Sequence, residues 1–560
     1  MFHLSKNHDP AKNDQLISQF FSREPSIKQI VQETNNLFTQ CKKHYPIPSN
    51  IETPRSLSIG RFFQKAASFF INLLLPSERS RPAASSETLV DEAGNVFPAW
   101  KKLLDKEYET FTKQVTREVN IEQFGAVGDG VTDCTEAFRK AIGKGKVKVH
   151  IPKGVFIVKE IRLPSFTYLV GADKDRTILK LHDKAPKSSW LITNSDHKKG
   201  NHHLSVENMT LDWNVERLGD IPRTSTGGNR SSCLTYAHVT YGWVKRVKAI
   251  NPGLHCFDVS STKYSYSGDG TRARGGSKYV WLDHLQGYGF GDDGITTHHS
   301  DFIFISNSHM CDPSGKAHKE GFSNSNGIEV DDGSRNVWLL NNSTTRCFGG
   351  VEIKAHETSS AANNVHIIGH VSVNDNRSFN FRHIGHHSAA DPESLTAYNI
   401  TAARLVSIAP IRTELYRESK PRALVVSAYK NVIINHFAVI GDPNYDYEQQ
   451  PVIAIQYRSR NVHLHHVQIK DFKTAGVDIK IFGGGQRADD VHIKNVVIDQ
   501  SARTGIFIGA GIERVSVYNV TAKAEEGLCG CQADTPSARF KNIMAKGYKV
   551  ALSEAASKQK

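Results

Sequence analysis

The stretch that decides the fold is Phe124-Gly-Ala-Val-Gly-Asp-Gly-Val-Thr-Asp133. Its glycines suit tight turns in which a Cβ would clash. The chain before it shows helical spacing of apolar residues, and the chain after it shows short β segments separated by turn residues. We therefore expect a helical N-terminal region and linker over residues 1–85, a helical neck over 86–118 and an all-β domain over 119–560.

A second pattern repeats along the β domain, at intervals of roughly 22 to 35 residues. Each copy has a polar residue, most often Asn or Asp, followed by alternating Val, Ile or Leu. One such unit cannot bury its apolar face alone, so units that repeat at this spacing stack and share one long core. The copies begin at Tyr279, Asp301, Asn336, Asn364, Asn431, Asn461, Asp490 and Arg514.

These two features resemble the pectate-lyase-like right-handed parallel β-helix proteins, a family that includes polygalacturonase relatives and phage tailspike depolymerases. The resemblance implies an all-β fold, a right-handed single-stranded parallel β-helix with a helical region in front. The segment from Asp91 to Trp100, with the helix after it, resembles the particle-binding transition of some phage proteins. That likeness implies a homotrimer whose N-terminal region attaches to a larger assembly such as a virion, in a virion tail or outside the cell.

Four short stretches within the β domain share one template, in which apolar and polar positions alternate. If they are strands of successive coils, their polar side chains lie on one face about 4.8 Å apart. Glu329 then lies beside Glu352, and Asp331 lies beside Lys354. Neighbouring carboxyls resist double ionisation, so one pKa rises while Lys354 keeps Asp331 ionised. The stretches are Gly294–His298, Gly327–Asp331, Gly350–Lys354 and Asn380–Ile384.

This face is the predicted site, because paired carboxyls can supply the acid and the base of glycosidic cleavage. Loops that follow or precede the four strands add further polar groups, including Asp332. The candidate catalytic residues are Asp292, Asp293, Glu329, Asp331 and Glu352. The candidate substrate-binding residues are Tyr288, His298, Lys354, His356, Arg382 and His383.

Two elements of the site also resemble known enzymes. Asp292 and Asp293 resemble the Gly-Asp-Asp element of polygalacturonases, and Gly350–Lys354 resembles their Gly-Val-Arg-Ile-Lys element. Here Gly294 stands where they have Cys, and Glu352 stands where they have Arg, so hydrolysis of uronates in particular is in doubt. Tyr288-Gly-Phe290 resembles the start of the Tyr-Gly-Phe-Asp-Pro-His signature of alginate epimerases, which keeps proton abstraction open.

The leading hypothesis is a hydrolase that cleaves a complex, acidic or capsular, polysaccharide. A lyase or epimerase would instead use Lys354, His356 or Tyr288 as the base and Arg382 to neutralise a uronate. A spike that binds glycans without cleaving them is the alternative from another class. We expect no cofactor, with binding of Ca²⁺ by the carboxylates left open.

The net charge and the apolar segments limit the classes of partner that we expect. The formal charge of +13 favours acidic partners. No nucleic-acid-binding motif accompanies that charge, so we expect a polysaccharide and no nucleic acid. The polar N-terminus has no signal-peptide core, and the apolar run from Phe62 to Leu75 is too short to span a bilayer, so we expect no transmembrane segment.

Overall fold

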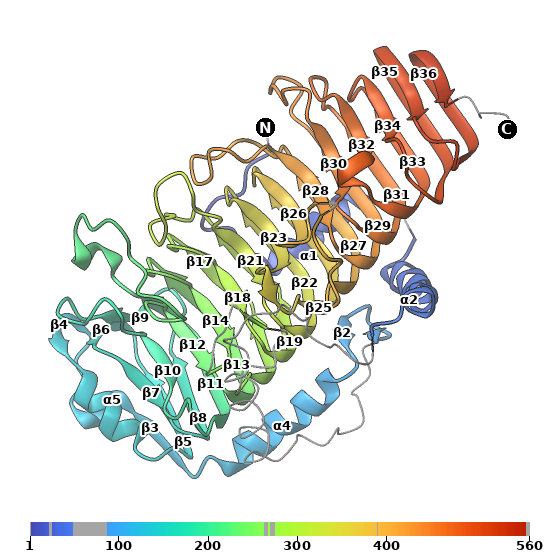
Figure 1. The fold of residues 1–560 in the computed structure, drawn as a ribbon. Coiled ribbons are helices and arrows are strands. Elements are labelled where there is room, and N and C mark those ends of the chain that lie inside the picture. The colour runs from blue at the N-terminus through green and yellow to red at the C-terminus, as the bar shows by residue number, and fades with distance from the viewer. Residues whose placement is uncertain are drawn as a thin grey trace, which may run out of the picture.

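The computed structural model describes residues 2–21, 25–48, 87–262, 267–268, 275–388 and 390–555. Most of them form a parallel β-helix, as the sequence predicts, and its coils run from the α5 end to the C-terminal strands (Figure 1). The apolar run from Phe62 to Leu75 lies outside the described residues. No described helix has the length and hydropathy needed to cross a bilayer.

The strands form three parallel stacks, which we call A, B and C. Stack A starts with β3 (Arg117–Asn120), β5 (Val147–Ile151) and β8 (Thr167–Gly171), and later includes β16 (Lys278–Asp283) and β19 (Asp301–Ser306). Stack B contains β4 (Asp129–Asp133), β6 (Gly154–Val158), β9 (Thr177–Leu181), β17 (Gln286–Tyr288) and β20 (His309–Cys311).

Longer strands run through both A and B. They are β11 (Asn201–Asp212), β13 (Val239–Ile250), β22 (Arg335–Thr345), β25 (Asn363–Val373), β27 (Tyr398–Ile408), β29 (Lys430–Ile440), β31 (Arg460–Lys470), β33 (Asp489–Asp499), β35 (Val515–Ala533) and β36 (Ala538–Glu554). The last two also extend into stack C.

Stack C forms the third side. Its strands are β7 (Ile161–Leu163), β10 (Ile192–Asn194), β12 (Leu234–Ala237), β14 (Phe257–Ser260), β18 (Ile295–Thr297), β21 (Asn326–Val330), β23 (Gly349–Ala355), β26 (Arg377–His383), β28 (Arg422–Ser427), β30 (Pro451–Gln456), β32 (Val477–Ile481) and β34 (Thr504–Ile508). Two short pairs lie outside the stacks: β1 (Thr88–Val90) with β2 (Val96–Pro98), and β15 (Ser267–Gly268) with β24 (Thr358–Ser359).

Single residues with left-handed backbone explain the repeat seen in the sequence. Seven of the eight residues that open a copy have a positive φ, and in the copy at Asp301 it is the next residue, Phe302, that has it. Asparagine tolerates this conformation better than most residues. The side-chain amides of four of these opening residues, together with that of Asn399, also bond from coil to coil, at N···O distances of 2.8 to 3.3 Å. This asparagine ladder consists of Asn336, Asn364, Asn399, Asn431 and Asn461.

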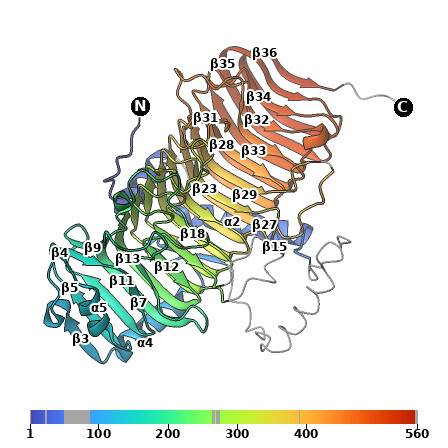
Figure 2. The ribbon, with the colours of Figure 1, turned by 60° about the vertical axis from the view of Figure 1, so that its left-hand side comes forward.

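Helices cover one end and one flank of the β-helix. The amphipathic helix α5 (Thr135–Ile142) packs its buried face on the first coil. Helices α1 (Asn13–Ser18), α2 (Ile27–His44) and α4 (Lys101–Gln114) lie along one flank, and α2 contacts β27 and β29 (Figure 2). Short 3-10 turns complete the list: η1 (Pro10–Lys12), η2 (Gln19–Phe21), η3 (Ile121–Phe124), η4 (Val215–Leu218) and η5 (Gly484–Gln486).

The described N-terminal residues are part of the β-helix surface. Ile17 and Phe21 pack on Val371 and Val406, and Trp100 joins a buried cluster with Trp338. The predicted helical neck over 86–118 also contains the β1–β2 hairpin, and the main sheet already begins within it, at β3.

We predict that Asn431→Ala lowers the free energy of unfolding by about 2–4 kcal/mol. Asn431 is buried, and its Nδ2 donates to Asn399 Oδ1 and to Tyr45 O at 2.8 and 2.7 Å. Alanine loses both bonds and also strains the backbone at φ +59°. Chemical denaturation measures the change.

Asn431→Gly is the matched control, because glycine accepts the left-handed backbone and loses the hydrogen bonds alone. It should fall between the wild type and Asn431→Ala. Equal stability of all three proteins would show that the asparagine ladder does not hold the coils or α2.

Candidate active site

Polar residues of five successive coils form rows on the outer side of stack C. Register pairing aligns Asp258, Thr296, Glu329, Glu352 and Asn380 from β14 to β26. The predicted neighbours Glu329 and Glu352 are thus confirmed as directly paired. Apolar residues between them, such as Ile328 and Val351, point into the core.

Lys354 is the central cation of the site. Its Nζ lies 2.7 Å from Glu329 Oε1 and 3.7 Å from Asp331 Oδ2, and all three side chains are buried. Burial opposes the charge of Lys354, but Asp331 and Glu329 raise its pKa well above the ordinary value. The lysine is therefore a fixed positive charge.

The two acidic partners of Lys354 shift in opposite directions. Burial favours the neutral form of Asp331, but Lys354 and His298, whose Nε2 lies 3.4 Å away, lower its pKa. Burial raises the pKa of Glu329, and the charges of Asp331 and Glu352 add to the rise although Lys354 opposes it.

Glu352 occupies the next coil. Its Oε1 accepts hydrogen bonds from Arg382 Nε and from Asn380 Nδ2. Its Oε2 is buried and has no hydrogen-bond partner among the described residues. A donor that reached this buried oxygen would satisfy its hydrogen-bonding capacity.

Asp292 and Asp293 meet at a buried histidine. His255 Nε2 lies 3.6 Å from an oxygen of each, and His255 Nδ1 lies 2.9 Å from Asp258 Oδ2. His318 Nε2 lies 2.7 Å from Asp292 Oδ1. Although burial favours its neutral form, hydrogen bonding to Asp258 and Asp292 raises the pKa of His255 to about 9.

The adjacent aspartates therefore differ in ionisation. Burial would raise the pKa of Asp292, but hydrogen bonds from His255 and His318 lower it. Burial raises the pKa of Asp293 well above its ordinary value, and the charges of Asp292 and Glu329 raise it further. The pKa values of the two adjacent carboxyls are thus displaced in opposite directions.

The site has a buried floor and a partly exposed rim. Lys354, Glu329, Asp331 and Glu352 form the floor. The rim side chains are Asp292, Arg382, His318 and His356, which are 17%, 22%, 35% and 37% exposed. A ligand from solution meets the rim first.

His356 connects the rim to the loop after β21. Its Nδ1 lies 2.9 Å from Asp332 Oδ2. Burial lowers the pKa of His356, but Asp332 and Asp331 more than offset that effect and raise it. His356 thus adds positive charge beside Asp331.

Two predicted substrate-binding residues lie away from this cluster. Tyr288 is in β17, so it belongs to stack B, and its ring lies 5.2 Å from Lys6 Nζ. His383 shares the inward side of β26 with Phe381 and bonds to Ser394 Oγ at 2.7 Å. Burial lowers the pKa of His383 to about 3, so it is neutral.

The sequence did not lead us to predict four residues of the site, which are His255, Asp258, His318 and Asn326. The alternation in Phe257-Asp-Val-Ser260 is the signal for Asp258, because it matches the template without its glycine. His255 precedes this strand and lies outside the alternation. Asn326 opens β21, where it bonds to Asp293 Oδ1 and Glu329 Oε1. His318 is in a loop, where no periodicity marks it.

Several of these groups could hold a cation. One group, in which the ligand atoms lie within 4.8 Å of one another, consists of His298, Glu329 and Asp331. A second group of the same kind consists of His255, Asp292 and Asp293. Ca²⁺ prefers oxygen ligands alone, whereas each of these groups includes a histidine. Lys354 also supplies a positive charge next to Glu329 and Asp331. Calcium binding therefore stays a prediction from the sequence.

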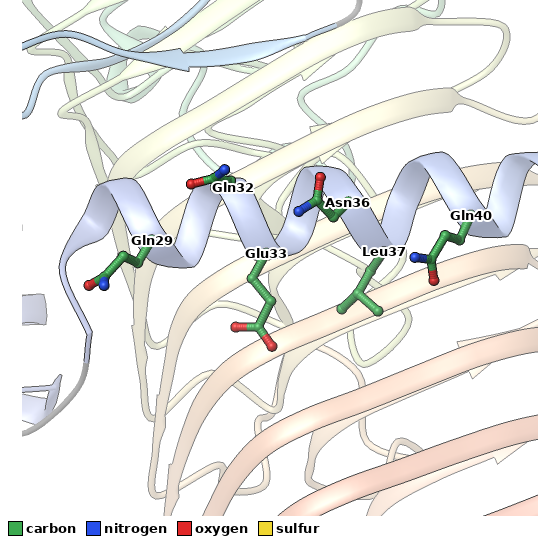
Figure 3. Close-up of a pocket in the computed structure, with 6 residues that line it drawn as sticks. All are labelled: Gln29, Gln32, Glu33, Asn36, Leu37 and Gln40. Atoms are coloured by element: carbon green, nitrogen blue, oxygen red, sulfur yellow. The ribbon is translucent and has the colours of Figure 1, made fainter.

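A separate cavity of about 330 Å³ lies along α2 (Figure 3). Its lining is Gln29, Gln32, Glu33, Asn36, Leu37 and Gln40. This cavity has one carboxyl, that of Glu33, among side-chain amides, so it lacks the pair of carboxyls found on stack C.

Comparison with known proteins identifies a family and several relatives that this chain resembles. Residues 118–352 match the family described as rhamnogalacturonase A/epimerase, pectate lyase-like. The chain is 49% identical over 468 residues to the phage-related protein YobO of Bacillus subtilis, covering 84% of this chain and 58% of YobO. It is 42% identical over 408 residues to the pre-neck appendage protein of Bacillus phage phi29, covering 72% of this chain and 47% of that protein.

The chain thus spans about half the length of the curated relatives it matches. The crystal structure of the N-terminal fragment of bacteriophage phi29 gene product 12 superposes with a TM-score of 0.72 at 35% identity, covering 80% of this chain and 74% of that fragment. The chain belongs to the pectate lyase-like family of right-handed parallel β-helix proteins.

Proposed function

We propose that the protein hydrolyses glycosidic bonds of a cell-surface polysaccharide. The observation that carries this proposal is the pair Asp292 and Asp293, which share His255 Nε2 at 3.6 Å and whose pKa values are shifted in opposite directions. Two carboxyls with separated pKa values are the acid and base that glycosidic cleavage needs.

In the proposed reaction, Asp293 is the general acid. Its Oδ1 accepts from Asn326 N and Nδ2 at 2.9 and 3.1 Å, and its Oδ2, which carries the proton in this proposal, lies 3.6 Å from His255 Nε2. Asp293 gives this proton to the leaving glycosidic oxygen as the C–O bond breaks. Asp292 takes a proton from the water that adds to the sugar carbon, so one water is consumed for each bond cleaved.

Hydrolysis fits this site better than β-elimination, which requires a strong base. Lys354 holds its proton because its pKa is raised, and the pKa of His356 is raised as well. Of the three bases considered for a lyase or epimerase, Lys354 is held in ion pairs, Tyr288 belongs to another stack, and the protonated form of His356 is favoured by its acidic neighbours.

The buried ion pairs support a secondary role for part of the predicted catalytic set. Glu329 and Asp331 are bound to Lys354 below the rim, so we propose that both fix its charge and that Glu329 also raises the pKa of Asp293. Glu352 is proposed to accept a hydrogen bond from substrate through its Oε2.

We also propose that the protein is attached to a phage particle and acts from there. Relatives from Bacillus phages are named as pre-neck appendage proteins, and the match covers 72% of this chain. A homotrimer remains part of the proposal, and sedimentation equilibrium of the full chain tests it.

We predict that Asp292→Asn and Asp293→Asn each reduce cleavage by about 10²–10⁴-fold, because each removes one proton-transfer group. Reducing ends released from Bacillus envelope polysaccharides, with capsular and plant polysaccharides in parallel, provide the measurement. Asp105→Asn, a change at a half-exposed residue of α4, is the control and should keep full activity.

Wild-type rates in both site variants would place catalysis elsewhere. A wild type that binds one of these polysaccharides and cleaves none would favour the glycan-binding spike.

We predict that His318→Gln moves the acidic limb of the pH–rate profile to higher pH. The histidine stabilises ionised Asp292, so its loss raises the pKa of that base and protonates it at a higher pH. The alkaline limb, set by Asp293, should stay in place. An unchanged acidic limb would show that Asp292 is not the base.

A further inference from the structure

Two arginines face each other beside the candidate active site. Arg377 of β26 and Arg422 of β28 are directly paired in register. Strands of one sheet lie about 4.8 Å apart, and like charges in directly opposite positions destabilise a sheet. The pair is therefore unfavourable for the fold by itself.

Neither arginine forms an ion pair with a carboxylate among the described residues. Arg377 Nη1 lies 3.5 Å from Asn380 Oδ1, and its Nε is buried without a hydrogen-bond partner in the described part of the chain. Arg422 donates to Pro451 O at 2.9 Å and to Gln450 Oε1 at 3.1 Å. Both groups retain unused donors.

Two neighbouring cations are paired with carboxylates, which distinguishes them from Arg377 and Arg422. Arg382 bonds to Glu352, and Lys420 Nζ lies 2.6 Å from Glu448 Oε2. Burial lowers the pKa of Arg377 to about 10, with a contribution from the charges of Arg382 and Arg422. It stays charged at neutral pH but carries an electrostatic cost.

The pair lies next to the proposed chemistry. Asn380 contacts Arg377 through its Oδ1 and donates from Nδ2 to Glu352 Oε1. The row continues from Asn380 through two uncharged residues to Lys480, about 14 Å further along stack C. Lys480 has no described carboxylate partner either, and its Nζ lies 4.6 Å from the ring centre of Phe482.

We propose that Arg377 and Arg422 form an anion subsite that binds an oxyanion of the polymer, a carboxylate or a phosphate. The inference rests on the proposed function and adds the substrate class, an anionic glycan extended along stack C. An oxyanion between the two guanidinium groups satisfies their free donors and removes their repulsion.

Binding to the full-length Asp292→Asn protein tests the subsite without turnover. The probes are polygalacturonate for carboxylates, inorganic polyphosphate for phosphates and dextran as the neutral polymer. Arg377→Gln and Arg422→Gln should each weaken binding of at least one polyanion about tenfold or more, because each removes charge-assisted hydrogen bonds. The polyanion that loses more affinity identifies the oxyanion.

Lys420→Gln is the matched control, since it removes one positive charge at the same edge from a residue already paired with Glu448. It should change polyanion binding less than threefold. Arg377→Gln should keep or raise the melting temperature, because it relieves repulsion.

Unchanged polyanion binding in both arginine variants would overturn the subsite. The subsite would also be overturned if Arg377→Gln lowered the melting temperature and Lys420→Gln lost as much polyanion affinity as the arginine variants. The loss of binding would then come from altered structure and net charge. Cleavage by Asp292→Asn at the wild-type rate would instead refute the proposed function, and the binding results would stand apart from it.

Discussion

The constraint on which the rest of the structure depends is the fixed register between coils. Left-handed single-residue turns close the coils, and the asparagine ladder bonds one turn to the next. A slip of one residue would turn every side chain to the opposite face. Because register is held, polar residues far apart in sequence, from Asp258 to Asn380, align in one row.

Burial then divides this row into groups with different chemistry. Moving a carboxylate out of water favours its neutral form unless a cation or hydrogen bonds compensate. Lys354 lowers the pKa of Asp331, whereas burial and the charges of Asp292 and Glu329 raise the pKa of Asp293. The site therefore combines fixed charge on its floor with a carboxyl whose neutral form is favoured beside the rim.

Sequence reasoning succeeded where the signal was local. Alternation and repeat spacing predicted the β-helix and the pairing of Glu329 with Glu352, because both follow from the two-residue period of strands. It failed for Tyr288 because the chain turns between β17 and β18, so a residue close in sequence belongs to another stack. His383 continues the alternation but lies on the side of Phe381.

Contacts between distant segments could not be predicted in this way. The docking of α2 depends on residues more than 380 positions away, such as Asn431 and Asn461. His318 reaches Asp292 from a loop whose path no periodicity describes. The paired arginines became visible only when β26 and β28 were aligned.

The chemistry itself is tested most directly by cleavage in ¹⁸O-labelled water. Oligosaccharides released from Bacillus envelope polysaccharides are separated and their masses measured, with absorbance recorded for new double bonds. Hydrolysis by the Asp292 and Asp293 pair predicts one ¹⁸O atom in each released fragment pair and no unsaturated product. Unsaturated fragments without ¹⁸O would contradict the account and establish elimination.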